Sequence, residues 1–127
     1  MKTPVPRLLL ILLVCSLGAA GHGQTRTELS LACDGADPDW SLTLHGAQAE
    51  LNYGGASVLD IPQQSSAEGR DWPKVLTLVG QQDTAIVVLH PRRCDNALVT
   101  AYPIEATVLT QRGQSPVVLS GCCRYSD

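Results

Sequence analysis

The sequence predicts an all-β fold, a single small antiparallel β-barrel or sandwich of seven to eight strands stapled by two disulfides. Three observations support this prediction. Apolar and polar residues alternate with a period of two along most of the 127-residue chain after residue 28, which is typical of half-buried strands. Clusters of Gly, Pro, Asn and Asp separate the alternating runs. Four cysteines follow an export signal, and an even cysteine count in a small exported chain is typical of a disulfide framework.

The N-terminus has the three parts of a secretory signal peptide. Lys2 and Arg7 precede an apolar run at 8–17, and small residues follow at 18–21. We therefore predict a signal peptide at 1–20, with the exact cleavage site open by a few residues. The apolar run is shorter than the roughly 20 residues that a membrane-spanning helix needs, so we expect no transmembrane segment in the mature chain.

The rest of the chain is predicted to be a short linker at 21–27 and one β-barrel domain at 28–127, because no repeat or second composition interrupts it. Export implies a periplasmic or secreted protein. A lipid anchor at Cys15 is not expected, because Val14 before it is not the small residue that we would expect at that position.

The first half of the domain is predicted to be a meander of four strands. In "TELSLAC" at 27–33 and "DWSLTLHG" at 39–46, alternate residues are apolar, which places one face of each strand on a core. A glycine ends the second strand, and "AQAELNY" at 47–53 repeats the alternation. A Gly-Gly turn then leads into "ASVLDIP" at 56–62, and we expect a polar loop at 63–73.

The second half supplies four more runs. "KVLTLVG" at 74–80 and "TAIVVLHP" at 84–91 are apolar on both faces and rich in β-branched residues, so we predict that they are the central strands. Only the segment 95–101, "DNALVTA", could form a helical turn. The last two runs are "YPIEATVLTQ" at 102–111 and "PVVLSGCCRY" at 116–125, joined by a turn at 112–113.

Alternation along the last strand also bears on the disulfides. Cys122 and Cys123 are adjacent, so their side chains should point to opposite faces and bond to different partners. One should reach Cys33 and the other Cys94. Both cross-pairings remain open, and we favour Cys33–Cys123 with Cys94–Cys122. The alternative is a thiol-redox protein that uses Cys122 and Cys123, which would require an exposed sulfur with a lowered pKa.

The charge of the mature chain restricts its partners. The chain has nine Lys and Arg against twelve Asp and Glu, and residues 1–20 carry two of the basic side chains and no acidic one, so the net charge changes from −3 to −5 on cleavage. An acidic domain disfavours nucleic acid and mildly favours cationic partners. We expect a monomer that binds an unidentified protein or envelope ligand.

Catalytic and metal-binding motifs are missing from the sequence. It contains no Gly-x-Ser-x-Gly elbow, no Gly-rich phosphate loop after a strand and no Cys-x-x-Cys knuckle, so we predict no enzymatic activity, no cofactor and no metal site. The aspartates at 34, 37 and 39 are not spaced like a calcium loop and favour a solvated turn instead.

Four residues are candidate contacts for a partner. Trp72 lies in the polar loop beside Arg70, where its ring could either anchor a partner or close one end of the barrel as a lid. Asp37 and Asp39 in the first turn offer a negative charge to a cationic partner. We therefore take Trp72, Arg70, Asp37 and Asp39 as the predicted binding residues.

Two stretches resemble an uncharacterised family of small exported bacterial proteins. "CDGADPDWSLTL" matches its opening motif through Gly35, Asp37, Pro38 and Trp40, although Asp39 stands where that family usually has its first aromatic residue. The second half of the family's sequence is resembled by the residues Cys94, Asp95, Tyr102, Pro103, Gly121 and Cys122. The family is similar in organisation to META domains and to membrane-bound C-type lysozyme inhibitors. The resemblance implies a disulfide-bonded β-barrel in the bacterial envelope, with a binding role and no known reaction.

The resemblance to the C-type lysozyme inhibitors implies a second function. Those inhibitors insert a Ser-Gly loop followed by a Tyr into the lysozyme cleft, with a Lys from a neighbouring strand. Here the corresponding segment, "QQSSAEGRDWPK" at 63–74, contains Ser65, Ser66 and Gly69 but no Ser-Gly pair and no following Tyr. Binding of a basic hydrolase is therefore the alternative function, supported by the acidic charge of the domain.

Overall fold

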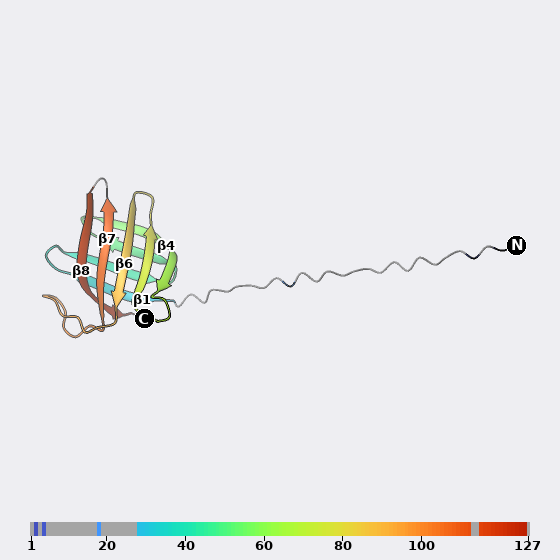
Figure 1. Ribbon diagram of the computed structural model, residues 1–127. Coiled ribbons are helices and arrows are strands. Elements are labelled where there is room, and N and C mark those ends of the chain that lie inside the picture. The colour runs from blue at the N-terminus through green and yellow to red at the C-terminus, as the bar shows by residue number, and fades with distance from the viewer. Residues whose placement is uncertain (1, 3, 5–17, 19–27, 113–114, 127) are drawn as a thin grey trace.

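Each strand of the protein pairs with the strand that follows it in the sequence, and the last strand pairs with the first. The computed structural model describes residues 2, 4, 18, 28–112 and 115–126, and from residue 30 to 125 eight antiparallel strands form a closed barrel (Figure 1). The predicted all-β class, the barrel and both disulfides are confirmed. The strands are β1 (Ser30–Gly35), β2 (Trp40–His45), β3 (Gln48–Asn52), β4 (Ala56–Ser66), β5 (Lys74–Val79), β6 (Asp83–His90), β7 (Ile104–Arg112) and β8 (Ser115–Tyr125).

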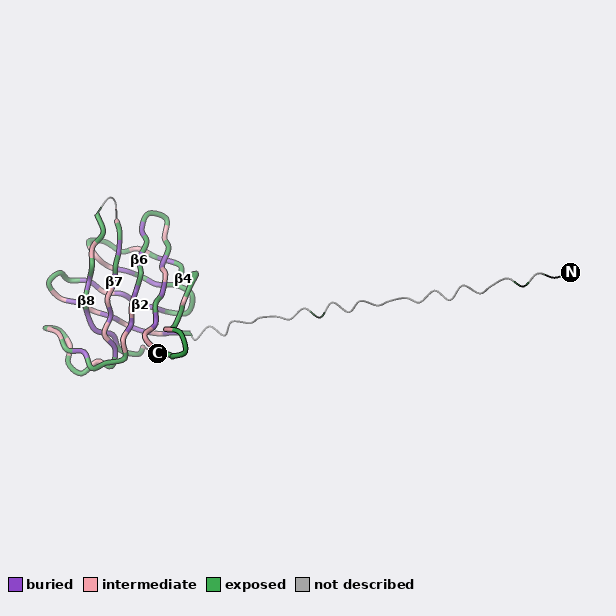
Figure 2. Tube along the Cα trace, in the orientation of Figure 1, coloured by how far each residue is buried: buried purple, intermediate pink, exposed green. Residues whose placement is uncertain are grey.

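The inward side chains of the barrel are mainly aliphatic. Buried residues alternate with more exposed ones along β2, β6 and β7, and Figure 2 shows this alternation on the front of the barrel. Eight strands enclose a space that side chains can just fill. The interior is therefore a packed core rather than a ligand chamber, and its leucines are Leu29, Leu31, Leu42, Leu44, Leu51, Leu59, Leu76, Leu78, Leu89 and Leu119.

The barrel closes where β8 meets β1, and this seam carries one of the two disulfides. Cys33 and Cys123 are directly opposite each other in the β1–β8 ladder, with their Cα atoms 4.0 Å apart and both residues buried in the core. This bridge joins residues 90 positions apart in the sequence. Cys122 points to the outside of the same strand and bonds to Cys94, so the opposite orientation of the adjacent cysteines is confirmed.

The indole of Trp40 crosses the same seam from the inside. Trp40 pairs with Gly35 on β1, and its Nε1 donates a hydrogen bond of 3.1 Å to the carbonyl of Ser120 on β8. A Cβ on Gly35 or on Gly121 would overlap the indole, so both positions are small to make room for it. Trp40 is 5% exposed, which agrees with the burial expected from the strand pattern.

The long connection between β6 and β7 folds back over the outside of the seam. Asn96 Nδ2 donates to the carbonyl of Asp34 at 3.2 Å, and Asp95 Oδ1 accepts the backbone N–H of Ala101 at 2.5 Å. This hydrogen bond, together with the Arg93 guanidinium, holds the pKa of Asp95 below its ordinary value against an opposing effect of desolvation. The helical turn predicted at 95–101 is wrong, because these side chains satisfy the backbone in a non-helical loop.

Two further differences from the sequence prediction concern strand limits and exposure. The loop predicted at 63–73 begins later, because β4 continues to Ser66 and pairs with β5 after a register shift. β5 and β6 do lie between other strands in the wall, but their second apolar face lies on the barrel surface.

The predicted signal peptide at 1–20, the linker at 21–27 and the glycine of the turn at 112–113 lie outside the described residues, apart from residues 2, 4 and 18.

Candidate functional site

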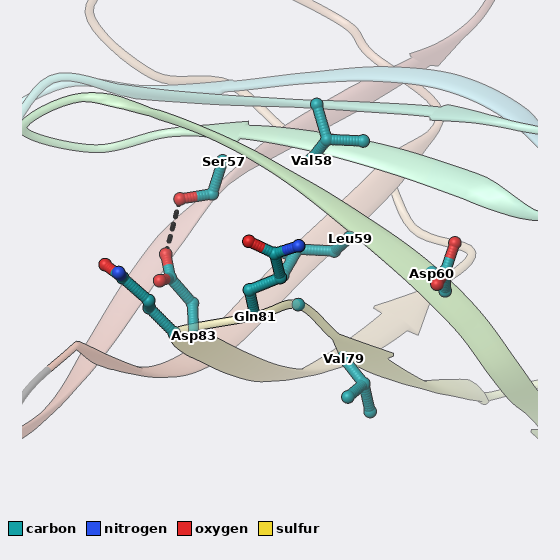
Figure 3. A pocket seen from close by; sticks show the side chains of 9 residues that line it. Ser57, Val58, Leu59, Asp60, Val79, Gln81 and Asp83 are labelled. Atoms are coloured by element: carbon teal, nitrogen blue, oxygen red, sulfur yellow. Dashed lines mark hydrogen bonds between the residues drawn. The ribbon is translucent and has the colours of Figure 1, made fainter.

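A groove opens between the start of β4 and the hairpin that joins β5 to β6. It has a volume of about 640 Å³ and is lined by residues 57–60 of β4 and residues 79–83 of the hairpin. Figure 3 shows Gln81 between the two backbones, with Val58 and Val79 on either side of it. β4 begins four residues before Asp60, the first of its residues that pairs with β5, so residues 56–59 have no partner on β5 and border the groove.

Backbone groups of β4 face this groove. Ile61 N–H donates to the Ala47 carbonyl and Tyr53 N–H to the Gly55 carbonyl, which fixes the alternate pairs of the β3–β4 ladder that are hydrogen-bonded. Val58 belongs to one of the other pairs, so its backbone N–H and C=O point away from β3. Gly80 lies so close to β4 that a Cβ on it would be 2.5 Å from a methyl group of Leu59. The hairpin therefore leaves too little room at Val58 for an added peptide strand.

The guanidinium of Arg112 ties the groove to the rest of the rim. Its Nε lies 2.7 Å from Asp83 Oδ2, in a geometry that fits an ion pair rather than an aligned hydrogen bond. Ser57 Oγ donates to the same oxygen at 2.5 Å and accepts from Arg112 at 3.0 Å. The guanidinium also donates to the carbonyls of Leu51, Tyr53 and Gly55.

This cluster joins the β3–β4 turn to β6 and β7. Ser57 Oγ contacts the Asp83 carboxylate and the Arg112 guanidinium, and these two groups also form an ion pair with each other. The three side chains therefore tie β4, β6 and β7 together. We interpret this cluster as a structural link between strands. The sequence did not predict it, because Ser57, Asp83 and Arg112 come from three separate strands.

The outward face of β5 to β8 is free of charge over three consecutive rows. The middle row consists of Thr77, Ile86, Leu109 and Val118, which are directly opposite one another in the ladders. The rows on either side consist of Val79, Thr84, Gln111 and Pro116, and of Val75, Val88, Thr107 and Ser120. We call these twelve residues the uncharged face; its strands β6, β7 and β8 lie side by side in Figure 1.

Large aliphatic side chains of the uncharged face are open to solvent. Val118 is 64% exposed, and Ile86 and Leu109 are 43% and 42% exposed. Charge returns at the borders of the face, where Asp60 of β4 lies opposite Val79 and where, in the next row, His90 pairs with Glu105. By contrast, outward positions on β3 and β4 include Glu50 and Asp60. Seven of its twelve residues are aliphatic or proline, so the uncharged face is a candidate interaction surface.

The predicted binding residue Trp72 lies at the end of the barrel where β4 connects to β5. Its ring is partly buried and packs against the core, which supports the lid rather than the exposed anchor. Lys74 lies beneath it, 8% exposed, with its Nζ 5.1 Å from the ring centroid and 3.1 Å from Ser66 Oγ. Arg70 is exposed in the same connection.

The other two predicted binding residues are not near Trp72. Asp37 and Asp39 are exposed in the turn between β1 and β2, which joins the opposite strand ends from those joined by the β4–β5 connection. Asp39 lines a shallow hollow with Trp40, Tyr53 and Leu98. The four predicted residues therefore do not form one site.

The described residues form neither a cluster of metal ligands nor a helix that could span a membrane. Within residues 28–112 and 115–126, no group of three or more His, Cys, Asp or Glu could hold a metal ion. In the same residues no helix has the length and hydrophobicity to cross a membrane. All four described cysteines are in disulfides, so thiol chemistry at Cys122 or Cys123 would first require reduction of a buried bond.

Comparison with models of known protein families, with curated proteins and with solved structures finds no match to this chain. The resemblance to the exported bacterial family, the META domains and the lysozyme inhibitors therefore stays a prediction. The uncharged face did have a signal in the sequence, since "KVLTLVG" and "TAIVVLHP" are apolar at both odd and even positions. This pattern predicts that both faces of the two strands are buried, but it does not indicate whether another molecule buries the outward face.

Proposed function

We propose that the protein is a non-catalytic binding protein of the periplasm or cell exterior, which docks a partner protein through the uncharged face. The uncharged face is the observation that carries this proposal. Three rows of outward side chains on four strands contain no ionised group, whereas the chain as a whole contains 21 charged side chains among 127 residues, nine basic and twelve acidic. Charged residues are depleted at the centres of protein interfaces in the same way.

The export of the protein is supported by the two disulfides and the N-terminal sequence. Disulfides persist in oxidising compartments and are rare in the cytosol. The two disulfides also stabilise the binding surface, which lies on a barrel with a small core. A hydrogen-bonded sheet also lowers the entropic cost of binding, because its backbone is already ordered before the partner arrives.

The proposal is tested by photo-crosslinking in the cells that make the protein. A photoreactive amino acid at Leu109 should give one discrete adduct with a different protein, because this side chain is at the centre of the uncharged face. The matched control places the same amino acid at Thr43, an exposed outward position on β2. We expect no discrete adduct at Thr43 and loss of the Leu109 adduct when Val118→Glu is added.

Two results would contradict the proposal. One is equal labelling at Leu109 and Thr43, which would indicate random collision. The other is that the adducts at Leu109 contain only copies of this chain, since the protein would then have no foreign partner on this surface.

A second candidate function is inhibition of a basic hydrolase such as a C-type lysozyme. The observation that favours it is the environment of Lys74, whose described neighbours within 4.0 Å include no carboxylate. A nearly buried cation without an acidic partner is costly unless a ligand supplies the missing charge. A carboxylate in the cleft of an enzyme is one such ligand.

Lysozyme activity measured against increasing protein concentration tests this second function. Inhibition would reach completion near one equivalent and would be weakened at least tenfold by Lys74→Met, which keeps the length of the side chain but removes its charge. Arg70→Met is the matched control, because it removes an exposed charge from the same connection. Full lysozyme activity in the presence of excess protein would rule this function out.

A further inference from the structure

We propose that a hollow between the β1–β2 turn and the β3–β4 turn binds an ammonium group on an aliphatic stem, supplied by a free alkylamine or by a lysine side chain. The hollow has a volume of about 480 Å³, within the range of roughly 300–1,000 Å³ for small-molecule sites. We call it the rim hollow, and its side chains are those of Asp39, Trp40, Ser41, Asn52, Tyr53 and Leu98. None of these belongs to the uncharged face, so the inference goes beyond the proposed function and does not depend on it.

The polar side chains of the rim hollow offer acceptors and no positive charge. The side chains of Asp39 and Ser41 form no hydrogen bond or ion pair with any described residue. Asn52 Nδ2 donates to Glu50 Oε1 at 3.3 Å, which leaves its Oδ1 as an acceptor. No Lys, Arg or His is among the described residues that line the hollow. A fitting ligand therefore supplies the donors and the positive charge, and an ammonium has three N–H donors and no acceptor.

The apolar walls of the rim hollow select a cation that carries a carbon stem. The Tyr53 ring is half-buried and packs against the core, and Leu98 adds an aliphatic wall that is 61% exposed. An ammonium is attracted to the face of an aromatic ring, and its methylene groups cover aliphatic surface. A metal ion would use neither contact, so the walls fit an alkylammonium better than a metal ion.

The walls are held in place by bonds within the protein. Arg112 donates to the carbonyls of Tyr53 and Gly55, and Tyr53 N–H donates to the Gly55 carbonyl at 3.1 Å. Leu98 N–H donates to Asn96 Oδ1 at 2.8 Å, and Asn96 in turn donates to the backbone of β1. Walls that are ordered before the ligand arrives lower the entropic cost of binding.

The charges around the rim hollow favour a cation. Asp37 is exposed two residues before Asp39 in the same turn and adds a second negative charge. Arg112 contacts the β3–β4 turn, but its charge is paired with Asp83 at 2.7 Å, and the two residues line a separate hollow. The net charge of −3 for the whole chain acts in the same direction as the two aspartates.

Titration of the oxidised protein with n-butylamine, followed through the amide resonances at about pH 7, tests the site, because the probe is then protonated like a lysine side chain. We expect a dissociation constant of about 1 to 30 mM, since an exposed ion pair contributes little affinity. The shifts should centre on Ser41, Asn52 and Tyr53. 1-Butanol has the same stem without the charge and should bind about three- to fivefold more weakly. Added salt should weaken binding of the amine and not of the alcohol.

Two variants locate the charge that is recognised. Asp39→Asn keeps the shape of the side chain and should weaken n-butylamine about three- to fivefold without changing the response to 1-butanol. Asp37→Asn is the matched control, because it makes the same change in net charge at a residue that does not line the hollow, and its effect should stay below about twofold. The proposal is overturned if the amine and the alcohol bind alike, if Asp39→Asn leaves the dissociation constant of n-butylamine unchanged, or if the shifts centre on another part of the barrel.

Nα-acetyl-lysine methylamide distinguishes the two sources of the ammonium. Binding within about threefold of n-butylamine assigns the rim hollow to a lysine side chain of a polypeptide, because the hollow then accepts the peptide groups on either side. Weaker binding assigns it to a free alkylamine. Failure of the amine titration rejects this inference alone, whereas failure of photo-crosslinking at Leu109 rejects the proposed function alone.

Discussion

Replacing Cys33 and Cys123 together by alanine lowers the free energy of unfolding by about 4 to 5 kcal/mol, measured by urea denaturation under non-reducing conditions. The bridge closes a loop of 90 residues, and in the chain-entropy model the stabilisation grows with the logarithm of loop length. The variant also leaves a gap in the core, because both cysteines are buried. We expect a domain that is unfolded or barely folded at 37 °C.

The second disulfide provides the matched control for this variant. Cys94 and Cys122 are separated by only 28 residues, so the same model gives about 3.5 kcal/mol for the paired alanine variant. This bridge ties the outer loop to β8, whereas the first joins the two strands at the seam. A reversed ranking, with the Cys94–Cys122 variant the less stable, would contradict the view that the seam carries the greater share of stability.

Much of the fold could be predicted from residue patterns alone. The alternation at Leu29, Leu31 and Cys33 placed these side chains on one face, and all three are buried. The orientation of Cys122 and Cys123 followed from the two-residue period of a strand, which is a local property. The choice between the two cross-pairings depended on which strand closes the barrel, and the favoured pairing agrees with the structure.

The parts that could not be predicted depend on contacts between distant strands. Arg112 clamps Asp83 to the β3–β4 turn, and neither residue is distinguished by its neighbours in the sequence. The helical turn expected at 95–101 failed because Asp95 and Asn96 bond to the loop backbone, which competes with helix formation. Trp72 could be either a lid or an anchor on the sequence, since burial of a loop side chain depends on what the other strands place beneath it.

The second large effect is expected at Trp40. Truncation to alanine should lower the free energy of unfolding by about 3 to 5 kcal/mol, because a large buried ring is lost and its space cannot collapse fully. The ring lies against Gly35 and spans the distance from β2 to the Ser120 carbonyl on β8. Its loss therefore weakens the same seam that the first disulfide closes.

The two glycines beneath the indole allow this explanation to be tested with a double-mutant cycle. The atoms that a Cβ on Gly35 would meet all belong to Trp40, so Gly35→Ala should cost about 1 to 3 kcal/mol in the native background and much less when Trp40→Leu is also present. Gly121 is the control, because its nearest atom is the backbone oxygen of Asp34, which a smaller side chain at Trp40 cannot remove. Gly121→Ala should therefore stay destabilising in both backgrounds. If both glycine substitutions were rescued alike, backbone movement at the seam and not contact with the indole would explain why these positions are glycine.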